Sequence, residues 1–184
     1  MSPNTATVLF VDVASGKKST YESLRETTQQ FGNGLQSKWN WQKGDIIATM
    51  TPNTIDVIPV IFGTILVGGI LCPLSFTYTV DELVTSLNQS KAKALVTNIA
   101  CLDVALKAAS KVGMPLNHIL LVGQTKSDVK VKHFSSLQST SGCIKKVSIN
   151  PREDLAYLVY SSGTTGLPKG NERASMSCIK TLTI

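Results

Sequence analysis

Short apolar runs alternate with longer segments of helical periodicity along most of this chain. The runs are rich in β-branched and aromatic residues, and turn-forming residues bound them, a pattern that is typical of buried strands. The runs that we predict to be strands are Val8–Val13, Ile46–Met50, Ile70–Leu74, Ala94–Thr97, Ile119–Val122 and Leu155–Tyr160.

The segments between these runs carry helix start signals. Ser19 and Glu22 form one predicted capping box, and Thr79 and Glu82 form a second, which opens a helix of about ten residues. The segment 100–112 has apolar residues at helical spacing and is a third predicted helix. Helices are therefore expected between the strands.

The most apolar segment, Val57–Leu74, contains no charged residue. Its length meets the criterion for a membrane span, but two prolines interrupt it and Gly68–Gly69 is typical of a helix stop. We predict a buried helix followed by a strand, with Asn53 or Thr54 as the helix cap and Asp56 placed against the helix dipole.

Alternation of strands and helices predicts an α/β fold with a mainly parallel sheet flanked by helices, because each crossover returns the chain in the same direction. No internal repeat is visible. The segment 124–150 is polar and weakly patterned, so it is expected to form surface loops with one helical turn near Phe134–Leu137.

Composition and charge are those of a globular protein of 184 residues, 42% of them hydrophobic. The net charge is +6, and several lysines fall between Lys126 and Lys146. Nucleic-acid or anionic-membrane binding is one interpretation of these lysines. A solvated face is the favoured one, since no aromatic residues interleave with them.

The cysteines and histidines show no metal-binding or catalytic spacing. Four cysteines are widely scattered, which indicates reduced thiols in an intracellular protein, and the amino terminus lacks the pattern of a secretory signal, so secretion is not expected. His118 and His133 are interpreted as structural, and no metal ligand is assigned. The cysteines are Cys72, Cys101, Cys143 and Cys178.

One segment carries a dense set of anion-binding groups, and it directly follows the last predicted strand. The sequence from Ser161 to Gly170 combines glycines, serine and threonine hydroxyls, and Lys169. Glycines allow several N–H groups to converge on an anion, hydroxyls add neutral donors, and lysine adds a positive charge. Ligand loops also lie at the carboxyl ends of strands in α/β sheets. We predict a phosphate-binding loop.

The segment has two alternative interpretations. The P-loop pattern requires a second glycine where Pro168 stands and a serine or threonine where Gly170 stands, so the segment is a different phosphate loop. A flexible Ser/Thr/Gly linker is the other alternative. It is disfavoured because a buried apolar strand leads into the segment and Pro-Lys-Gly closes it.

At these residues the chain resembles the adenylate-forming superfamily, which includes acyl-CoA synthetases, 4-coumarate-CoA ligase and firefly luciferase. The resemblance extends over roughly residues 10–170 and favours the 4-coumarate-CoA ligase and luciferase branch. It implies that ATP is bound by the loop and that Lys169 stabilises charge on the phosphates during catalysis. The implied ATP contacts are Ser161, Ser162, Gly163, Thr164, Thr165, Gly166 and Lys169.

The family reaction implied is attack of a carboxylate on the α-phosphorus of ATP, followed by thioester formation with CoA, with Mg²⁺ accompanying ATP. Residues 1–170 are then expected to be part of an amino-terminal AMP-binding domain, and residues 171–184 an atypical, disordered tail. Because the segment after Gly170 lacks the Thr/Ser-His pair with which the family continues, truncation is expected. The family's adenine, acyl and mobile-domain residues lie downstream, so the isolated chain is expected to be inactive, with millimolar or no ATP affinity.

Other functions stay open at this stage. A non-catalytic truncated product or an interaction module that pairs with a full-length ligase is the main alternative, and a membrane-anchored protein is a third. The expected partners are a carboxylic acid, ATP and CoA, without nucleic acid or a transmembrane span. The expected location is cytoplasmic or peroxisomal, although the final residues Leu182–Ile184 are not a peroxisomal address.

Overall fold

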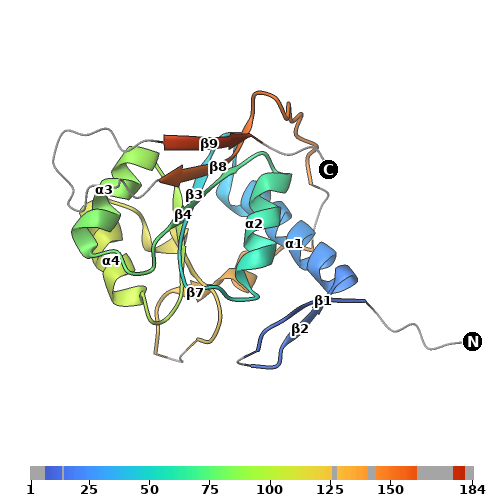
Figure 1. Cartoon of the computed structure of the whole chain (residues 1–184), viewed down its shortest axis with the longest axis horizontal. Coiled ribbons are helices and arrows are strands. Elements are labelled where there is room, and N and C mark those ends of the chain that lie inside the picture. Colours follow the sequence, from blue (N-terminus) through green and yellow to red (C-terminus); the bar gives the residue numbers. More distant parts are fainter. Residues whose placement is uncertain (1–6, 14, 126–127, 141–143, 161–175, 181–184) are drawn as a thin grey trace, which may run out of the picture.

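The computed structural model describes residues 7–13, 15–125, 128–140, 144–160 and 176–180. Within these residues the core is a seven-stranded sheet in the order β7-β6-β5-β3-β4-β8-β9 (Figure 1). Strands β7 to β8 in this order are parallel, and β9 is antiparallel to β8. The strands are β3 (Ile46–Met50), β4 (Ile70–Leu74), β5 (Ala94–Thr97), β6 (Ile119–Leu121), β7 (Lys132–His133), β8 (Leu155–Tyr160) and β9 (Met176–Lys180).

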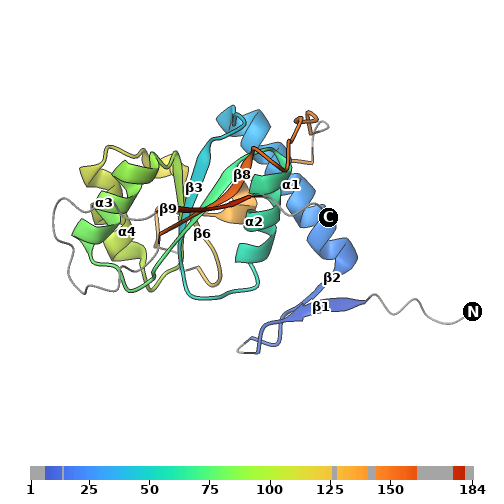
Figure 2. The same ribbon diagram turned by 45° about the horizontal axis from the view of Figure 1, so that its top comes forward.

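Helices cover both faces of this sheet (Figures 1 and 2). α1 and α2 pack together on one face, and α3 and α4 cover the other. The helical elements are α1 (Tyr21–Trp39), α2 (Val57–Leu66), α3 (Val80–Ser90), α4 (Leu102–Lys111) and the 3-10 turns η1 (Leu116–His118) and η2 (Phe134–Ser136). The predicted α/β fold with a mainly parallel sheet is confirmed.

The two faces of the sheet have separate hydrophobic cores because successive side chains of a strand point to opposite faces. Ile47 packs in one cluster with Phe31 of α1 and Val60 of α2. Leu95 packs in the other cluster with Leu83 of α3. Helices on both faces bury the central strands, which explains why the sequences of these strands are continuous apolar runs rather than alternating apolar and polar residues.

α1 and α2 approach each other closely at glycines. A Cβ on Gly63 of α2 would lie 2.9 Å from Phe31 Cδ1 and 2.9 Å from the Thr28 carbonyl oxygen. A Cβ on Gly32 would lie 3.2 Å from the Gly63 carbonyl oxygen. The small residues therefore set how near the two helices lie.

A separate antiparallel hairpin precedes α1. It consists of β1 (Val8–Val11) and β2 (Lys18–Thr20), and it lies beside the beginning of α1 (Figure 2). Gly16, with φ +71°, closes the turn, and its amide donates to the Asp12 carbonyl at 2.8 Å. The strand predicted at Val8–Val13 is confirmed over its first four residues. β2 was not predicted, because Lys-Ser-Thr carries no apolar pattern.

The capping box of α1 begins one residue later than predicted. Thr20 is the N-cap: its Oγ1 accepts from the Ser23 amide at 3.2 Å, and Ser23 Oγ accepts from the Thr20 amide at 2.9 Å. The predicted pair of Ser19 and Glu22 was therefore wrong. Ser19 belongs to β2, where it pairs with Phe10, and the extended backbone ends only at Thr20.

α3 has the predicted box. Thr79 Oγ1 accepts from the Glu82 amide at 3.4 Å, and Glu82 Oε2 accepts from the Thr79 amide at 2.8 Å. The bond from the Thr79 amide, together with one from the Thr79 hydroxyl to the same carboxylate oxygen at 2.7 Å, lowers the pKa of Glu82. Both partners lie where the sequence pattern placed them.

The predicted cap of α2 is not formed. Asp56 occupies the N-cap position and makes no side-chain capping bond, and Thr54 Oγ1 accepts only a long 3.5 Å bond from the Asp56 amide. The helix and strand predicted within Val57–Leu74 are confirmed as α2 and β4. No helix among the described residues is long and apolar enough to cross a membrane.

Polar residues at the amino ends of the strands have structural roles, as predicted for His118. Asp45 orders its turn, because its Oδ2 accepts from the Gln42 amide at 2.7 Å and lies 2.5 Å from Lys93 Nζ. His118 Nδ1 lies 2.9 Å from the Lys93 carbonyl oxygen, and its ring centroid is 4.8 Å from that of Trp39. Packing and hydrogen bonding thus account for His118.

Two cysteines are described with their side chains, and both are buried free thiols. Burial raises the pKa of Cys72 to about 12 and also raises that of Cys101. Thiols of this kind are unreactive. The expectation of reduced cysteines is thus confirmed for these two positions.

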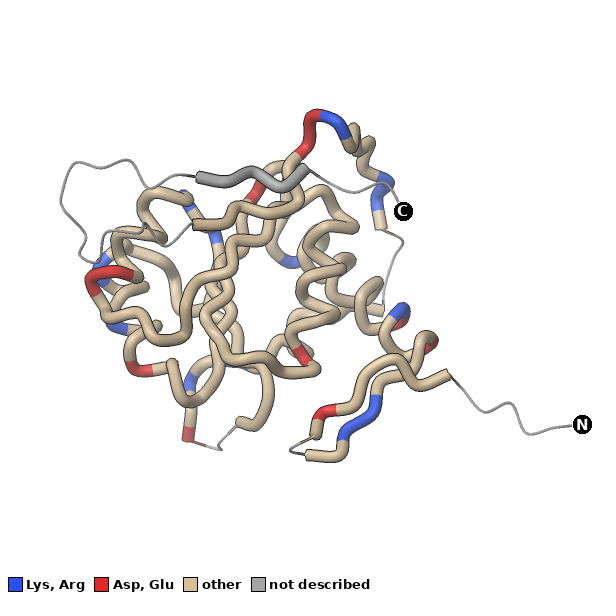
Figure 3. Tube along the Cα trace, in the orientation of Figure 1, with Lys and Arg blue, Asp and Glu red and all other residues tan. Residues whose placement is uncertain are grey.

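Lys and Arg are spread over several segments of the trace rather than gathered on one (Figure 3). Some pair with carboxylates, as Lys43 does with Asp154 at 2.5 Å and Lys107 with Asp103 at 2.7 Å. The solvated-face interpretation of residues 126–146 stays a prediction.

Within residues 171–184 the structure describes Met176–Lys180, which form β9 on the edge of β8. The expectation of an atypical, disordered tail over residues 171–184 stays a prediction. The domain boundary at residue 170 stays a prediction.

Candidate functional site: the carboxyl edge of the sheet

β8 leads to the carboxyl edge of the parallel sheet. Tyr157 pairs with Leu71 of β4, so the same parallel register, extended by three residues, places Tyr160 beside Leu74. The chain therefore leaves β8 at the level where β4 also ends. The predicted phosphate-binding residues start there, and they lie outside the described residues: Ser161, Ser162, Gly163, Thr164, Thr165, Gly166 and Lys169.

β8 is held firmly at this position. Ala156 and Leu158 are buried, and Leu158 packs in the core beneath α3 and α4. Tyr160, its last residue, donates its hydroxyl to the Ser86 carbonyl of α3 at 3.3 Å. Burial raises the pKa of Tyr160, with a further contribution from Cys72. Its phenol is a neutral donor that ties the end of β8 to α3.

Hydroxyl groups follow β4 at the same edge. Ser75 Oγ lies 2.7 Å from Thr77 Oγ1 and accepts from the Thr77 amide at 3.2 Å. Phe76, between them, is exposed. These residues were missed by the sequence analysis, although hydroxyl residues directly after a predicted apolar strand are the signal that could have found them.

The strand order changes direction at β3, which has β4 on one side and β5 on the other. The chain leaves β3 toward α2 on one face, and it leaves β4 and β5 toward α3 and α4 on the opposite face (Figure 1). Connections that diverge to opposite faces open a crevice at the carboxyl edge, which is where open α/β sheets bind ligands. The candidate loop after β8 starts next to this region, one strand beyond β4.

A buried carboxylate organises the other half of this edge. Asp56 Oδ1 lies 2.5 Å from Lys17 Nζ of the hairpin, and Asp56 Oδ2 accepts from the Gly123 amide after β6 at 3.1 Å. His133 Nε2 at the end of β7 is 3.7 Å from Oδ2, beyond hydrogen-bonding distance but close enough for electrostatic attraction. Separate elements thus converge on one carboxylate.

The electrostatics of this cluster favour the charged carboxylate. The neighbouring His133 ring, the Lys17 ammonium and the Gly123 amide hold the pKa of Asp56 well below its ordinary value, against the opposing effect of burial. The Asp56 side chain is only 11% exposed, so water screens these contacts weakly. This cluster could not be predicted from the sequence, since its members are far apart along the chain.

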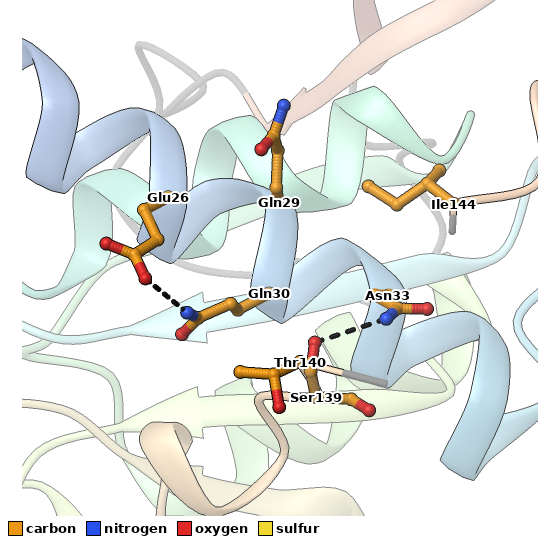
Figure 4. A pocket seen from close by; sticks show the side chains of 7 residues that line it. All are labelled: Glu26, Gln29, Gln30, Asn33, Ser139, Thr140 and Ile144. Carbon is orange, nitrogen blue, oxygen red and sulfur yellow. Dashed lines mark hydrogen bonds between the residues drawn. The ribbon is translucent and has the colours of Figure 1, made fainter. Parts of the chain in front are cut away.

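A polar pocket of about 500 Å³ lies elsewhere, between α1 and the segment around residue 140 (Figure 4). Two hydrogen bonds span its lining: Gln30 Nε2 donates to Glu26 Oε1 at 2.9 Å, and Asn33 Nδ2 donates to the Ser139 carbonyl at 3.1 Å. It shares no residue with the strand ends that form the carboxyl edge, so we assign it no part in the site.

Metal-binding groups are not gathered anywhere in the described part of the chain: no set of three His, Cys, Asp or Glu side chains there could hold an ion. Any Mg²⁺ that accompanies a nucleotide is therefore not assigned to described residues.

The fold and this edge define an α/β protein with an open, largely parallel sheet. A protein-family model described as "AMP-binding enzyme" matches residues 2–181, and the chain belongs to that family. Probable 4-coumarate–CoA ligase 1 of Dictyostelium discoideum is 31% identical over an alignment of 176 residues that covers 89% of this chain and 32% of the relative. Crotonobetaine/carnitine–CoA ligase of Salmonella enteritidis PT4 (strain P125109) is 30% identical over 168 residues, with the same coverage.

Solved structures show the same fold. The luciferase-like enzyme from the mealworm Zophobas morio matches with a TM-score of 0.75 and 21% identity over 94% of this chain and 39% of that chain. A long-chain-fatty-acid-CoA ligase from Archaeoglobus fulgidus matches with a TM-score of 0.69 and 25% identity over 86% and 30% of the two chains. This chain spans about a third of the length of its curated relatives.

Proposed function

We propose that this chain supplies the ATP-phosphate-binding part of an acid-CoA ligase. The observation that carries the proposal is the join between β8 and the segment 161–170: a buried parallel strand delivers a glycine- and hydroxyl-rich sequence with one lysine to the carboxyl edge, in a chain of the AMP-binding enzyme family. The curated relatives named above are CoA ligases, which supports the same reaction class.

In the proposed reaction a carboxylate oxygen attacks the α-phosphorus of ATP. An acyl-adenylate forms and pyrophosphate leaves; the CoA thiol then displaces AMP and yields a thioester. Nucleotidyl transfer is accelerated mainly by positioning and by stabilising charge on the phosphate oxygens. Lys169 and the backbone amides around Gly163 and Gly166 have the chemistry for this role, and Ser161, Ser162, Thr164 and Thr165 add neutral donors.

Within this proposal the isolated chain does not convert substrate. A few charge-assisted hydrogen bonds of about 1.5–3 kcal/mol each give weak affinity once ordering costs are subtracted, so millimolar or no ATP affinity is expected. Mg²⁺ would accompany ATP, and CoA, the acid and the adenine ring have no assigned contacts among the described residues. The proposed ligase reaction would take place inside the cell, in the cytoplasm or in peroxisomes.

A chimera tests the function. The part of this chain that aligns with the Dictyostelium ligase replaces the corresponding region of that ligase, and carboxylate-dependent pyrophosphate release is measured with a panel of aryl and fatty acids. We expect release above the level without acid. A folded chimera that releases none with any acid, while the unmodified ligase is active, contradicts the proposal.

Lys169→Met in the active chimera tests the loop. Because the lysine stabilises charge in the transition state, we expect turnover to fall by about 100-fold or more. Lys130→Met removes an exposed lysine remote from the loop in sequence and is the matched control, with turnover expected within about two-fold of the parent. Equal turnover of both variants would show that Lys169 has no role in the mechanism.

A non-catalytic interaction module is the second candidate function. The observation that favours it is an exposed apolar surface on α2 and β1, whose partner is inferred next.

A further inference from the structure

α2 is apolar on every side. It contains no charged residue, and its inward side is buried against α1 and the sheet. Its outward side carries Ile58, Ile61, Phe62 and Leu66, spaced three and four residues apart and left partly exposed. A helix that is apolar all round is normally covered on all sides, so the outward side of α2 is a surface built for packing.

β1 continues this surface. Phe10 and Val11 are exposed, and with Ile58 and Ile61 they line a groove of about 540 Å³ between the hairpin and α2. We call this surface the α2–β1 face, formed by Phe10, Val11, Ile58, Ile61, Phe62 and Leu66. Contiguous exposed apolar surface of this kind marks interaction sites rather than ordinary solvent-facing surface.

The opposite side of the molecule has a different character. The outer surface of α3 and α4 carries ion pairs between Lys107 and Asp103 and between Lys111 and Asp81. Such exposed charge pairs are typical of a helix face in water. The two helical layers therefore differ, and apolar packing is favoured on the α2 side.

The length of the relatives identifies the occupant. This chain covers 32% of the curated ligases and 30% of the Archaeoglobus ligase structure, so in each relative the same fold adjoins a further two thirds of a ligase chain. We infer that the α2–β1 face is the binding surface for the polypeptide corresponding to those remaining two thirds, and that it binds this polypeptide also when it is supplied as a separate chain.

The test is binding in trans. The 184-residue chain is mixed with the complement of the Dictyostelium ligase, that is, the part outside its aligned region, and with the equivalent complement of the Salmonella ligase. Association is measured by analytical ultracentrifugation without ATP. We expect a one-to-one complex with at least one complement; association with neither contradicts the inference.

Two similarly exposed leucines provide the matched variants. Leu66 on the α2–β1 face is 40% exposed, and Leu116 on η1 is 46% exposed. A charge placed in an apolar interface weakens it strongly, so Leu66→Glu is expected to weaken the complex by about 10-fold or more. Leu116→Glu is expected to leave it within about two-fold. Equal affinities would overturn the inference.

Two readouts keep the result unambiguous. Thermal unfolding by circular dichroism shows whether each variant folds, and Phe62→Ser replaces Leu66→Glu if that variant does not. A homodimer of the chain that Leu66→Glu dissociates would make a second copy the occupant and overturn the inference. The inference rests on the proposed ligase relationship, but binding is measured without ATP, so an inactive chimera together with a 184-residue chain that still binds the separate complement distinguishes the two.

Discussion

At the scale of single residues, Asp56 shows how one side chain fixes several elements. The sequence placed it in the first turn of α2 as a partner of the helix dipole. In the structure it lies at the N-cap of α2 and also contacts Lys17 of the hairpin, the amide of Gly123 after β6 and, at 3.7 Å, His133 of β7. Contacts with three parts of the chain are worth more than a single helix dipole interaction at an exposed site, which explains why the carboxylate is turned away from capping.

Asp56→Asn is expected to destabilise the chain by about 2 kcal/mol at pH 7, because hydrogen bonds to a buried charged group are lost while their donors remain. The measurement is urea unfolding followed by circular dichroism. Asp103→Asn is the control: its side chain is 77% exposed in an i,i+4 pair with Lys107. An exposed pair of this kind contributes about 0–1 kcal/mol.

The pH dependence of the Asp56 effect follows from its lowered pKa. The charged carboxylate stabilises the folded state fully above the ordinary carboxyl pKa of about 4. This stabilisation is lost as pH falls below that value toward the lowered pKa of the folded state. The difference between wild type and Asp56→Asn should therefore shrink between about pH 5 and pH 3. A difference that is constant or grows on acidification would contradict this assignment.

At the scale of elements, α3 begins at the capping box that its sequence predicts. Thr79→Ala removes the hydroxyl that caps the Glu82 amide and is expected to cost about 1 kcal/mol of unfolding free energy in a urea titration. Thr85→Ala, at an exposed position in the same helix, is expected to be neutral or slightly stabilising because alanine favours helix. The reverse order of the two variants would contradict the capping role.

At the contact of α1 with α2, a substitution that improves helix propensity is expected to destabilise the protein. Gly63→Ala places a methyl group 2.9 Å from the Thr28 carbonyl oxygen, which is backbone and cannot rotate away. Overpacking of this kind costs about 1–3 kcal/mol, despite the better helix propensity of alanine. Thermal unfolding should show a lower midpoint. An unchanged or higher midpoint would mean that the helices separate without cost.

Elements were predictable where a local signal and burial coincided. The five residues of β3 were predicted correctly because a buried parallel strand is a continuous apolar run. The Thr79 capping box was predicted correctly because its two partners lie within four consecutive residues. β2 and β7 could not be predicted, since three and two polar residues become strands only through partners elsewhere. The α1 cap was displaced to Thr20 for the same reason, because strand pairing of Ser19 overrode the local pattern.

At the scale of the whole molecule, the sheet order explains what the sequence could and could not indicate about the site. The phosphate-binding loop predicted after β8 rests on glycines, hydroxyls and a lysine that are contiguous in the sequence, and it stays a prediction because these residues lie outside the described ones. The convergence of Lys17, Asp56 and His133 was not, because the crossovers that bring β3, β6 and β7 to one edge are long-range features. The apolar helix α2 was recognised as buried, but its uncovered outer side became visible only in the structure.

The β8–β9 pairing fixes the two described residues that flank positions 161–175. Tyr160 is paired with Met176, so these two residues are neighbours on adjacent strands, about 5 Å apart. Bringing two distant points of a chain together costs conformational entropy. Under the proposed phosphate-binding role, the sheet itself offsets that closure cost through the β8–β9 pair.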